Sequence, residues 1–482
     1  MSVRLLISIA GLLLLWLSAN WLRSPRMRQG ILLLAGYIFY GVWDARFLGL
    51  LILSSLLNYR LGAYLKRRVS AGRLWLGLGF NLALLGAFKI LPLAKLIPGA
   101  NWLHTIALPL GISFWTFQAM SYLLDLYREE DLDPSLLEFC VYMAFFPTVV
   151  AGPIARLGNM LPQFREPGRF LWVQFGAGMR RVLLGIFMIA AGRVLGSGLA
   201  PNLGVDGGFA RSWQTWSALD VWVLCIGYGF QLFFDFAGYS NLVIGIAQTL
   251  GFELPENFNS PYLSQSPSQF WTRWHMSLSF WIRDYVFLPL AMLRRGTYWK
   301  NIALFTSMLA FGLWHKVSFT FLLWGAYHGL LLVAHRLWQQ WSGAMGKTLS
   351  RWGALVPWLV TFLSVNLGWI LFRARDLAQA KTMFWAVMSP RAYAGSRLPH
   401  VYYVMVGWCV VGYFLIMAGN ACLTWLSRRL PASGGLPQRW LGVIANERWV
   451  WVGPLMAVLA LYVFAVLNVP TSASAPTMYR VF

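Results

Sequence analysis

The stretch LVPWLVTFLSVNLGWILF, residues 355–372, carries no charged side chain and is followed directly by Arg373. A helix of roughly 20 apolar residues spans the hydrocarbon core of a bilayer. The stretch therefore predicts a transmembrane helix. Further apolar runs lie at residues 3–22, 31–43, 47–65, 74–91, 106–124, 182–199, 216–234, 301–314, 319–338, 402–426 and 449–469.

The composition of the whole chain agrees with this prediction. Of its 482 residues, 58% are hydrophobic and only 11% are charged, whereas a soluble domain has about 25% charged residues. No soluble domain of ordinary size fits between the apolar runs. We therefore predict an all-α, polytopic membrane protein whose surroundings are the lipid bilayer.

The net charge of +23 does not indicate nucleic-acid binding. Lys and Arg cluster at the ends of apolar runs, where they meet anionic lipid, and no basic stripe is interleaved with exposed aromatic residues. The four cysteines have no CxxC spacing, so neither a metal site nor a disulfide is expected.

The early basic residues predict the orientation of the chain, because Lys and Arg concentrate in cytoplasmic loops. If the N-terminus lies outside, alternation places only Arg4, Arg46 and Lys95 outside over the first four runs. The residues that it places inside are Arg23, Arg26, Arg28, Lys66, Arg67, Arg68 and Arg73. We predict a multi-pass protein whose N-terminus lies outside.

Two parts of the chain are less regular. Over residues 135–168 and 235–290, apolar pieces are interrupted by Pro, Gly and Asn, which predicts broken, re-entrant or interfacial helices. Irregular backbone lies at membrane depth only where protein buries it or where it lines a watery cavity. A functional site is therefore expected in these two parts.

Residues 266–285 read SPSQFWTRWHMSLSFWIRDY. Ser266 and Pro267 are typical of a helix start, and His275 falls on a polar stripe at helical spacing. One reading is a site histidine. The other is an interfacial amphipathic helix whose His275 lies at the waterline. Arg283 and Asp284 are most simply a local ion pair.

Residues 311–316 read FGLWHK and separate two apolar runs. His315 and Lys316 form either a short polar turn at the interface or part of a buried site. An imidazole beside a cavity suits general-base chemistry near neutral pH. For His328 and His335, seven residues apart in the next run, a structural role is favoured.

Several sequence blocks carry a resemblance to a known family. The blocks are PLGISFWTFQAMSYLLDLYR (109–128), FFPTVVAGPIARLGNMLPQF (145–164), FDFAGYSNLVIGIAQTLGFELPENFNSPY (234–262), FWTRWHMSLSFWIRDYVFLPL (270–290) and FGLWHKVSFTFLLWGAYHG (311–329). On these blocks the chain resembles the bacterial membrane-bound O-acyltransferases, and most closely the branch that acetylates alginate, cellulose or peptidoglycan. The resemblance implies a protein of the bacterial inner membrane, with the predicted outside N-terminus in the periplasm.

The resemblance implies a multi-helix fold with a central funnel or tunnel. An acyl group would pass from a cytoplasmic thioester, either acetyl-CoA or an acyl carrier protein, to an acceptor outside the membrane, with no bound cofactor. His315 inherits the family's essential position, where it would act as the base, and His275 inherits the second histidine position. Side chains expected to bind substrate are Trp274, Arg283, Asp284, Trp314 and Lys316.

Lys316 departs from the family pattern, which usually has glycine after the essential histidine. A lysine there could fill space beside the imidazole or repel its positive charge. We expect three parts along the chain: N-terminal transmembrane helices (1–105), a catalytic core with broken helices (106–345), and C-terminal helices and loops (346–482).

The expected reaction is O-acetylation of an exopolysaccharide of the alginate or cellulose type. No secreted domain with a nucleophilic Ser is encoded, so a separate periplasmic acyltransferase and a polysaccharide synthase complex are expected partners. The basic residues within 373–397 are a candidate contact for that acyltransferase, or they meet only lipid headgroups. Two alternatives are D-alanyl transfer to teichoic acid on the same fold, and a lipid or polysaccharide transporter.

Overall fold

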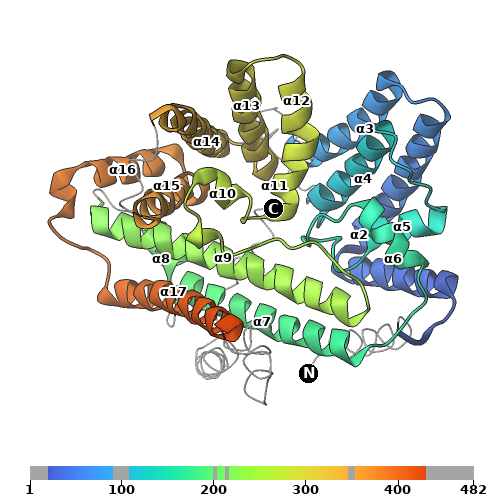
Figure 1. Ribbon diagram of the computed structural model, residues 1–482, viewed down its shortest axis with the longest axis horizontal. Coiled ribbons are helices and arrows are strands. Elements are labelled where there is room, and N and C mark those ends of the chain that lie inside the picture. Colours follow the sequence, from blue (N-terminus) through green and yellow to red (C-terminus); the bar gives the residue numbers. More distant parts are fainter. Residues whose placement is uncertain (1–19, 91–107, 199–203, 212–215, 346–352, 430–482) are drawn as a thin grey trace, which may run out of the picture.

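The computed structural model describes residues 20–90, 108–198, 204–211, 216–345 and 353–429. Every regular element within these ranges is a helix (Figure 1), and six helices there are long and apolar enough to cross a membrane. The predicted all-α polytopic architecture is therefore confirmed. The apolar run at 449–469, and most of the run at 3–22, lie outside the described residues.

The α-helices are α2 (Pro25–Arg67), α3 (Ala71–Ile90), α4 (Ile112–Tyr127), α5 (Leu136–Ala144), α6 (Leu157–Arg165), α7 (Trp172–Ser197), α8 (Val205–Ala210), α9 (Ala218–Thr249), α10 (Pro267–Trp271), α11 (Met276–Ile282), α12 (Leu288–Met292), α13 (Thr297–His315), α14 (Phe319–Met345), α15 (Leu355–Arg373), α16 (Leu377–Met388) and α17 (His400–Arg429). Two short 3₁₀ helices, Pro261–Leu263 and Pro390–Tyr393, and a π-helix, Arg283–Phe287, complete the set.

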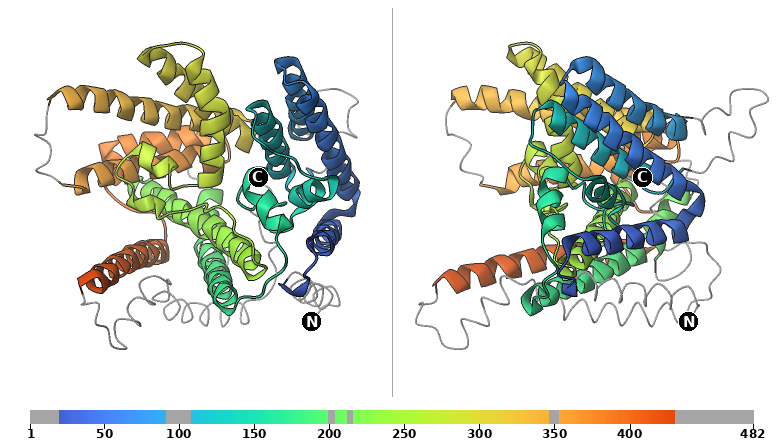
Figure 2. Two further views of the ribbon diagram at one scale, coloured as in Figure 1. Left: turned by 45° about the vertical axis from the view of Figure 1, so that its right-hand side comes forward. Right: turned by 90° about the vertical axis from the view of Figure 1, so that its right-hand side faces the viewer.

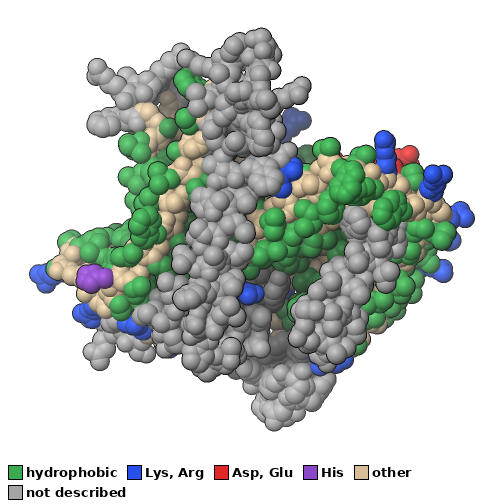
Figure 3. Space-filling model, turned by 90° about the horizontal axis from the view of Figure 1, so that it is seen from below, with side chains coloured by type: hydrophobic (Ala, Val, Ile, Leu, Met, Phe, Trp, Pro, Cys, Tyr) green, Lys and Arg blue, Asp and Glu red, His purple; other side chains and the backbone are tan. Residues whose placement is uncertain are grey.

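The six candidate spans are Ala45–Arg67 in α2, all of α3, α7, α9 and α15, and His400–Gly419 in α17. Hydrophobic side chains cover much of the described surface seen from below, with Lys and Arg gathered towards its edges (Figure 3). The run predicted at 106–124 is not a lipid-facing span, because α4 is buried in the protein along nearly its whole length. Its apolar sequence reflects a protein core and not a lipid-facing surface.

The runs predicted at 31–43 and 47–65 belong to one helix, α2, which has 43 residues. Figure 2 shows that α2 changes direction sharply between its two halves. No Pro or Gly separates the two runs, so nothing in the local sequence ends the helix there. The expected loop is therefore replaced by a bend within a continuous helix.

Helices α7 and α9 lie side by side (Figure 1) and meet through glycines spaced seven residues apart. A Cβ atom added at Gly178 would lie 2.7 Å from the carbonyl oxygen of Gly245, and one at Gly185 would lie 2.6 Å from that of Gly238. Small residues let helix backbones approach closely within a membrane. This glycine seam holds α9, which carries part of the site described below.

We predict that Gly185→Ala destabilises the protein, because the added Cβ would lie 2.5 Å from the backbone nitrogen of Leu242. Overpacking of this kind costs about 1–3 kcal/mol. Gly176→Ala on the same helix is the matched control, since its Cβ would meet only the end of the flexible Arg180 side chain at 3.4 Å. Melting curves of the two detergent-purified variants test the seam. Equal melting temperatures would contradict it.

The irregular part predicted at 135–168 is confirmed. Helix α5 begins with a capping box between Ser135 and Glu138 and ends at Ala144, and α6 follows after a loop. The irregular part predicted at 235–290 is wrong for its first residues, which complete α9 as far as Thr249. It is correct beyond Gly251, where the chain forms only short helical pieces.

Candidate active site

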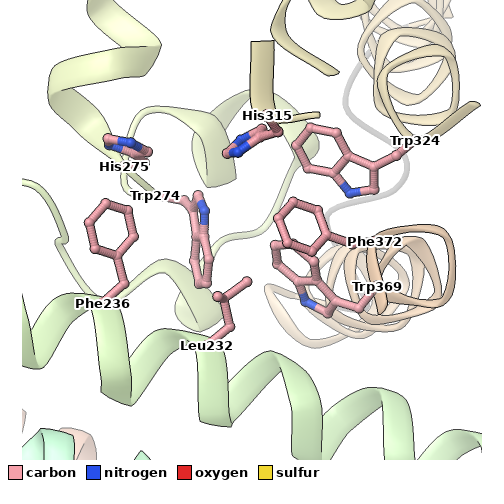
Figure 4. Close-up of a pocket in the computed structure, with 8 residues that line it drawn as sticks. All are labelled: Leu232, Phe236, Trp274, His275, His315, Trp324, Trp369 and Phe372. Atoms are coloured by element: carbon pink, nitrogen blue, oxygen red, sulfur yellow. The ribbon is translucent and has the colours of Figure 1, made fainter. Parts of the chain in front are cut away.

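A small buried cavity lies where α9, α13, α14 and α15 meet the broken segment between α10 and α11 (Figure 4). Eight residues line it: Leu232, Phe236, Trp274, His275, His315, Trp324, Trp369 and Phe372. Two of them are the histidines singled out in the sequence, 40 residues apart in the chain. The remaining walls are aromatic rings and one leucine.

His315 is the last residue of α13, and only 7% of its surface is exposed. Its helix packs tightly against α14, because a Cβ added at Gly312 would lie 2.3 Å from the carbonyl oxygen of Phe321. The imidazole then lies among rings, with centroid distances of 5.4 Å to Trp324 and 5.3 Å to Phe372. The polar-turn reading of this position does not hold, since the imidazole faces the protein interior.

Lys316 is exposed, and its backbone is extended with φ of −154°, a conformation open to any residue. The structure therefore needs no glycine here and does not bring the Lys316 side chain to the cavity. The cation at this helix end is instead Lys89 of α3, whose Nζ donates a hydrogen bond to the carbonyl oxygen of Trp314. Carbonyl groups in the last turn of a helix lack partners within the helix.

Sequence reasoning passed over Lys89, although one signal pointed to it. A lysine at the end of an otherwise apolar run is costly at membrane depth unless the protein uses it. Its Nζ also lies 5.0 Å from the centroid of the Trp314 ring, a cation–π distance. Lys89 thus fixes the end of α13 that carries His315.

His275 lies between α10 and α11, where the chain turns sharply. The continuous helix expected over residues 266–285 is wrong, since α10 ends at Trp271 and His275 has a left-handed φ of +43°. The predicted start is confirmed, because the Ser266 side chain accepts a hydrogen bond from the Gln269 amide. Such a φ costs about 1 kcal/mol or more for a residue other than glycine. The turn buries the imidazole to 1% exposure, so His275 is not at a waterline.

Asn257 holds His275 and was not predicted. Its Oδ1 lies 3.1 Å from His275 Nδ1, and it accepts hydrogen bonds from the Ser277 hydroxyl at 2.8 Å and the Ser277 amide at 3.3 Å. Its Nδ2 donates to Ser240 Oγ at 3.1 Å. Asn257 is fully buried, in a loop whose sequence, LPENFNSPY, shows no sign of which asparagine faces inward.

Two further predicted site residues, Trp274 and Trp314, lie close to the histidines. Trp274 lines the cavity beside His275, and Figure 4 shows its indole below the gap between the two imidazoles, with the nitrogen at the end nearer to them. Trp314 is buried behind His315, with its ring 4.7 Å from the imidazole and stacked on Phe117. It supports the site from outside the cavity wall.

The structure does not bring Arg283 and Asp284 to the cavity. Asp284 pairs with Arg283 at 2.6 Å, as the local ion pair predicts, and also with Arg156. Burial raises the pKa of the Asp284 carboxyl, but the hydrogen bonds from Arg283 and Arg156 outweigh burial and bring the pKa below its usual value. The ion pair between Asp284 and Arg156 links the π-helix to the loop before α6.

The other two histidines of this region do not line the cavity. His328 is fully buried, with its imidazole against the rings of Trp271 and Trp324. His335 Nδ1 lies 3.2 Å from the hydroxyl of Ser268. Both placements agree with the structural role favoured for them.

This fold and cavity define a multi-pass membrane protein with two histidines at one buried centre. The model of the membrane-bound O-acyltransferase family matches residues 93–362. A probable alginate O-acetylase of Pseudomonas putida is 33% identical, over 97% of both chains. A peptidoglycan O-acetyltransferase of Helicobacter pylori is 32% identical over 74% of this chain and 73% of its own.

A teichoic acid D-alanyltransferase of Streptococcus thermophilus is also similar, with 30% identity over 59% of this chain and 73% of its own. This chain belongs to the membrane-bound O-acyltransferase family. It is therefore an acyl-transferring membrane enzyme, as the sequence blocks predict, and not a transporter.

We predict that Lys89→Met lowers acyl transfer about tenfold or more, because small displacements of a reacting group cost large factors in rate. Lys89→Arg should keep most of the activity, since arginine also donates to the carbonyl of Trp314. Lys300→Met is the control, as this lysine is exposed at the other end of α13. Transfer rates normalised to membrane abundance test this. Normal transfer by Lys89→Met would show that Lys89 does not position His315.

Proposed function

We propose that the enzyme moves an acetyl group from a cytoplasmic thioester to a hydroxyl acceptor outside the membrane, for O-acetylation of an exopolysaccharide of the alginate or cellulose type. The observation that carries the proposal is the convergence of His275 and His315 on one buried, aromatic-walled cavity. The names of the alginate and peptidoglycan relatives support the acetyl group and the glycan.

The chemistry required is the attack of a hydroxyl on a thioester carbonyl. A group must accept the hydroxyl proton, a donor must stabilise charge on the carbonyl oxygen, and the leaving sulfur must gain a proton. The two histidines are the cavity residues able to accept and donate protons. We propose that His315 takes part in this proton transfer and that the reaction does not proceed without it. The aromatic walls exclude water, which would otherwise hydrolyse the thioester.

The lining favours acetyl over D-alanyl transfer. A D-alanyl group carries an ammonium ion, and a buried charge needs a partner of opposite sign. None of the eight lining residues in the described part of the chain is acidic. An acetyl group has no charge, and its small methyl group suits a cavity closed by large rings.

Both candidate donors, acetyl-CoA and an acetylated acyl carrier protein, would present a thioester to the cytoplasmic side of a bacterial inner membrane. On the opposite side we propose a separate periplasmic acyltransferase with a nucleophilic Ser, working beside a polysaccharide synthase complex. Part of the basic segment 373–397 is occupied, since Arg373 pairs with Asp206 at 2.7 Å. Next to the exposed Arg391, α16 exposes Trp385 and Met388, each to 76%, and this surface suits a contact with the acyltransferase.

We predict that His315→Ala abolishes acetylation of the polymer while membrane abundance stays near normal. The residue is proposed to move a proton, and alanine has no group that can do so. Acetyl esters on the polymer, measured beside an immunoblot of the membrane fraction, provide the test. Full acetylation by a well-expressed variant would remove His315 from the mechanism.

If residues 31–43 cross the membrane, as the sequence predicts, a periplasmic N-terminus gives opposite labelling at the two ends of the span Ala45–Arg67. In a background without the four native cysteines, Arg46→Cys should react with an impermeant maleimide in intact cells, and Val69→Cys should react only after lysis. Both side chains are exposed on the protein, so burial does not shield them. The reverse labelling pattern would invert the proposed topology.

A further inference from the structure

The side-chain amide of Asn257 fixes which nitrogen of His275 carries hydrogen. The backbone N–H of Ser277 can only donate, so the amide atom that faces it at 3.3 Å must be the oxygen, Oδ1. The nitrogen, Nδ2, then faces Ser240 Oγ at 3.1 Å. The amide therefore has one orientation consistent with its neighbours.

The same oxygen lies 3.1 Å from His275 Nδ1. Because an amide oxygen only accepts, Nδ1 must carry the hydrogen. A fully buried imidazole without a bonded carboxylate is neutral, since an unpaired buried charge is costly. Nε2 is then left with a bare lone pair, and it is buried with no hydrogen-bond partner in the part of the chain that the structure describes.

This lone pair selects between the two reacting groups. The acetyl end of a thioester presents only acceptors, its carbonyl oxygen and its sulfur. The acceptor hydroxyl is the reacting group that carries a hydrogen to donate. Neutral His275 in this tautomer therefore binds the hydroxyl and cannot stabilise the carbonyl oxygen. That role is left to the indole N–H of Trp274, which lies below the gap between the two imidazoles (Figure 4).

We infer that His275 takes the proton of the acceptor hydroxyl, and that Asn257 is the positioning residue that prepares it. The arrangement of a base oriented by a third group recurs in enzymes that activate hydroxyls and thiols. The inference rests on the proposed function. It divides the proton transfers between His275 and His315, whereas the sequence resemblance gives the base role to His315 alone.

In the step proposed, the hydroxyl proton moves to His275 Nε2 as the hydroxyl oxygen bonds to the acyl carbon. The carbon–sulfur bond then breaks, and the proton passes from the His275 imidazolium to the sulfur through His315, which accepts a proton on one ring nitrogen as it donates one from the other. Both imidazoles are neutral again once the sulfur is protonated. The products are the acetyl ester and the free thiol, with no net gain or loss of protons.

The test compares three variants of the full-length, detergent-purified enzyme. An alginate oligosaccharide serves as the hydroxyl acceptor, and release of free thiol from acetyl-CoA that depends on this acceptor is the readout. Asn257→Leu removes the acceptor for Nδ1–H and should lower the rate about 100-fold or more. Asn257→Asp keeps an acceptor and adds a negative charge that stabilises the imidazolium. It should stay within about tenfold of wild type and move the acid limb of the rate–pH profile to higher pH. Ser240→Ala, which removes only the partner of Nδ2, should change the rate by no more than about twofold.

A wild-type rate for Asn257→Leu, or an unshifted profile for Asn257→Asp, would overturn the inference. If Asn257→Leu fails to accumulate, His275→Asn decides the matter, because an amide can hydrogen-bond but cannot take a proton. We expect its rate to be as low as that of His275→Ala, and clear activity above that level would overturn the inference. These failures differ from failure of the proposed function, which an active His315→Ala variant would show.

Discussion

A chain that leaves the helical conformation at membrane depth must find partners inside the protein for every backbone group that it frees. The segment from Gly251 to His275 finds several such partners within the protein. Its amides and carbonyls bond to one another, as in the pairs Asn259 N to Arg273 O and Met276 N to Asn257 O, both at 2.9 Å. Helices α9, α13, α14 and α15 meet it around the cavity, and the site exists because this break is buried.

The same constraint explains why the supporting contacts come from distant parts of the chain. Lys89 lies 225 residues from the carbonyl that it caps. The glycine seam between α7 and α9 positions α9, the helix that carries Leu232 and Phe236. Each contact fixes one of the elements that line the cavity, so the imidazoles of His275 and His315 are held in position.

The sequence predicted the membrane class, most of the spans and both histidines. Hydropathy is a local property, so spans such as α15 could be read directly from their letters. The break at His275 could not be predicted, because TRWHMSLS has good helical spacing and the left-handed turn is held by hydrogen bonds to a distant loop, among them those of Asn257. The same limit applies to Arg283 and Asp284, whose place outside the cavity depends on Arg156. The seven-residue spacing of Gly178, Gly185 and Gly192, in contrast, was present in the sequence and could have indicated the seam.

The central claim is that the acyl carbon reacts inside the aromatic cavity, between His275 and His315. The most direct measurement is a cryo-electron microscopy structure of the full-length enzyme with a ketone analogue of acetyl-CoA, in which a methylene group replaces the thioester sulfur and the carbonyl group is kept. The account predicts density for the ketone within the cavity, with its oxygen towards the indole nitrogen of Trp274 and its carbon between the two imidazoles. Ordered density for the analogue at another place, with the cavity empty, would contradict it.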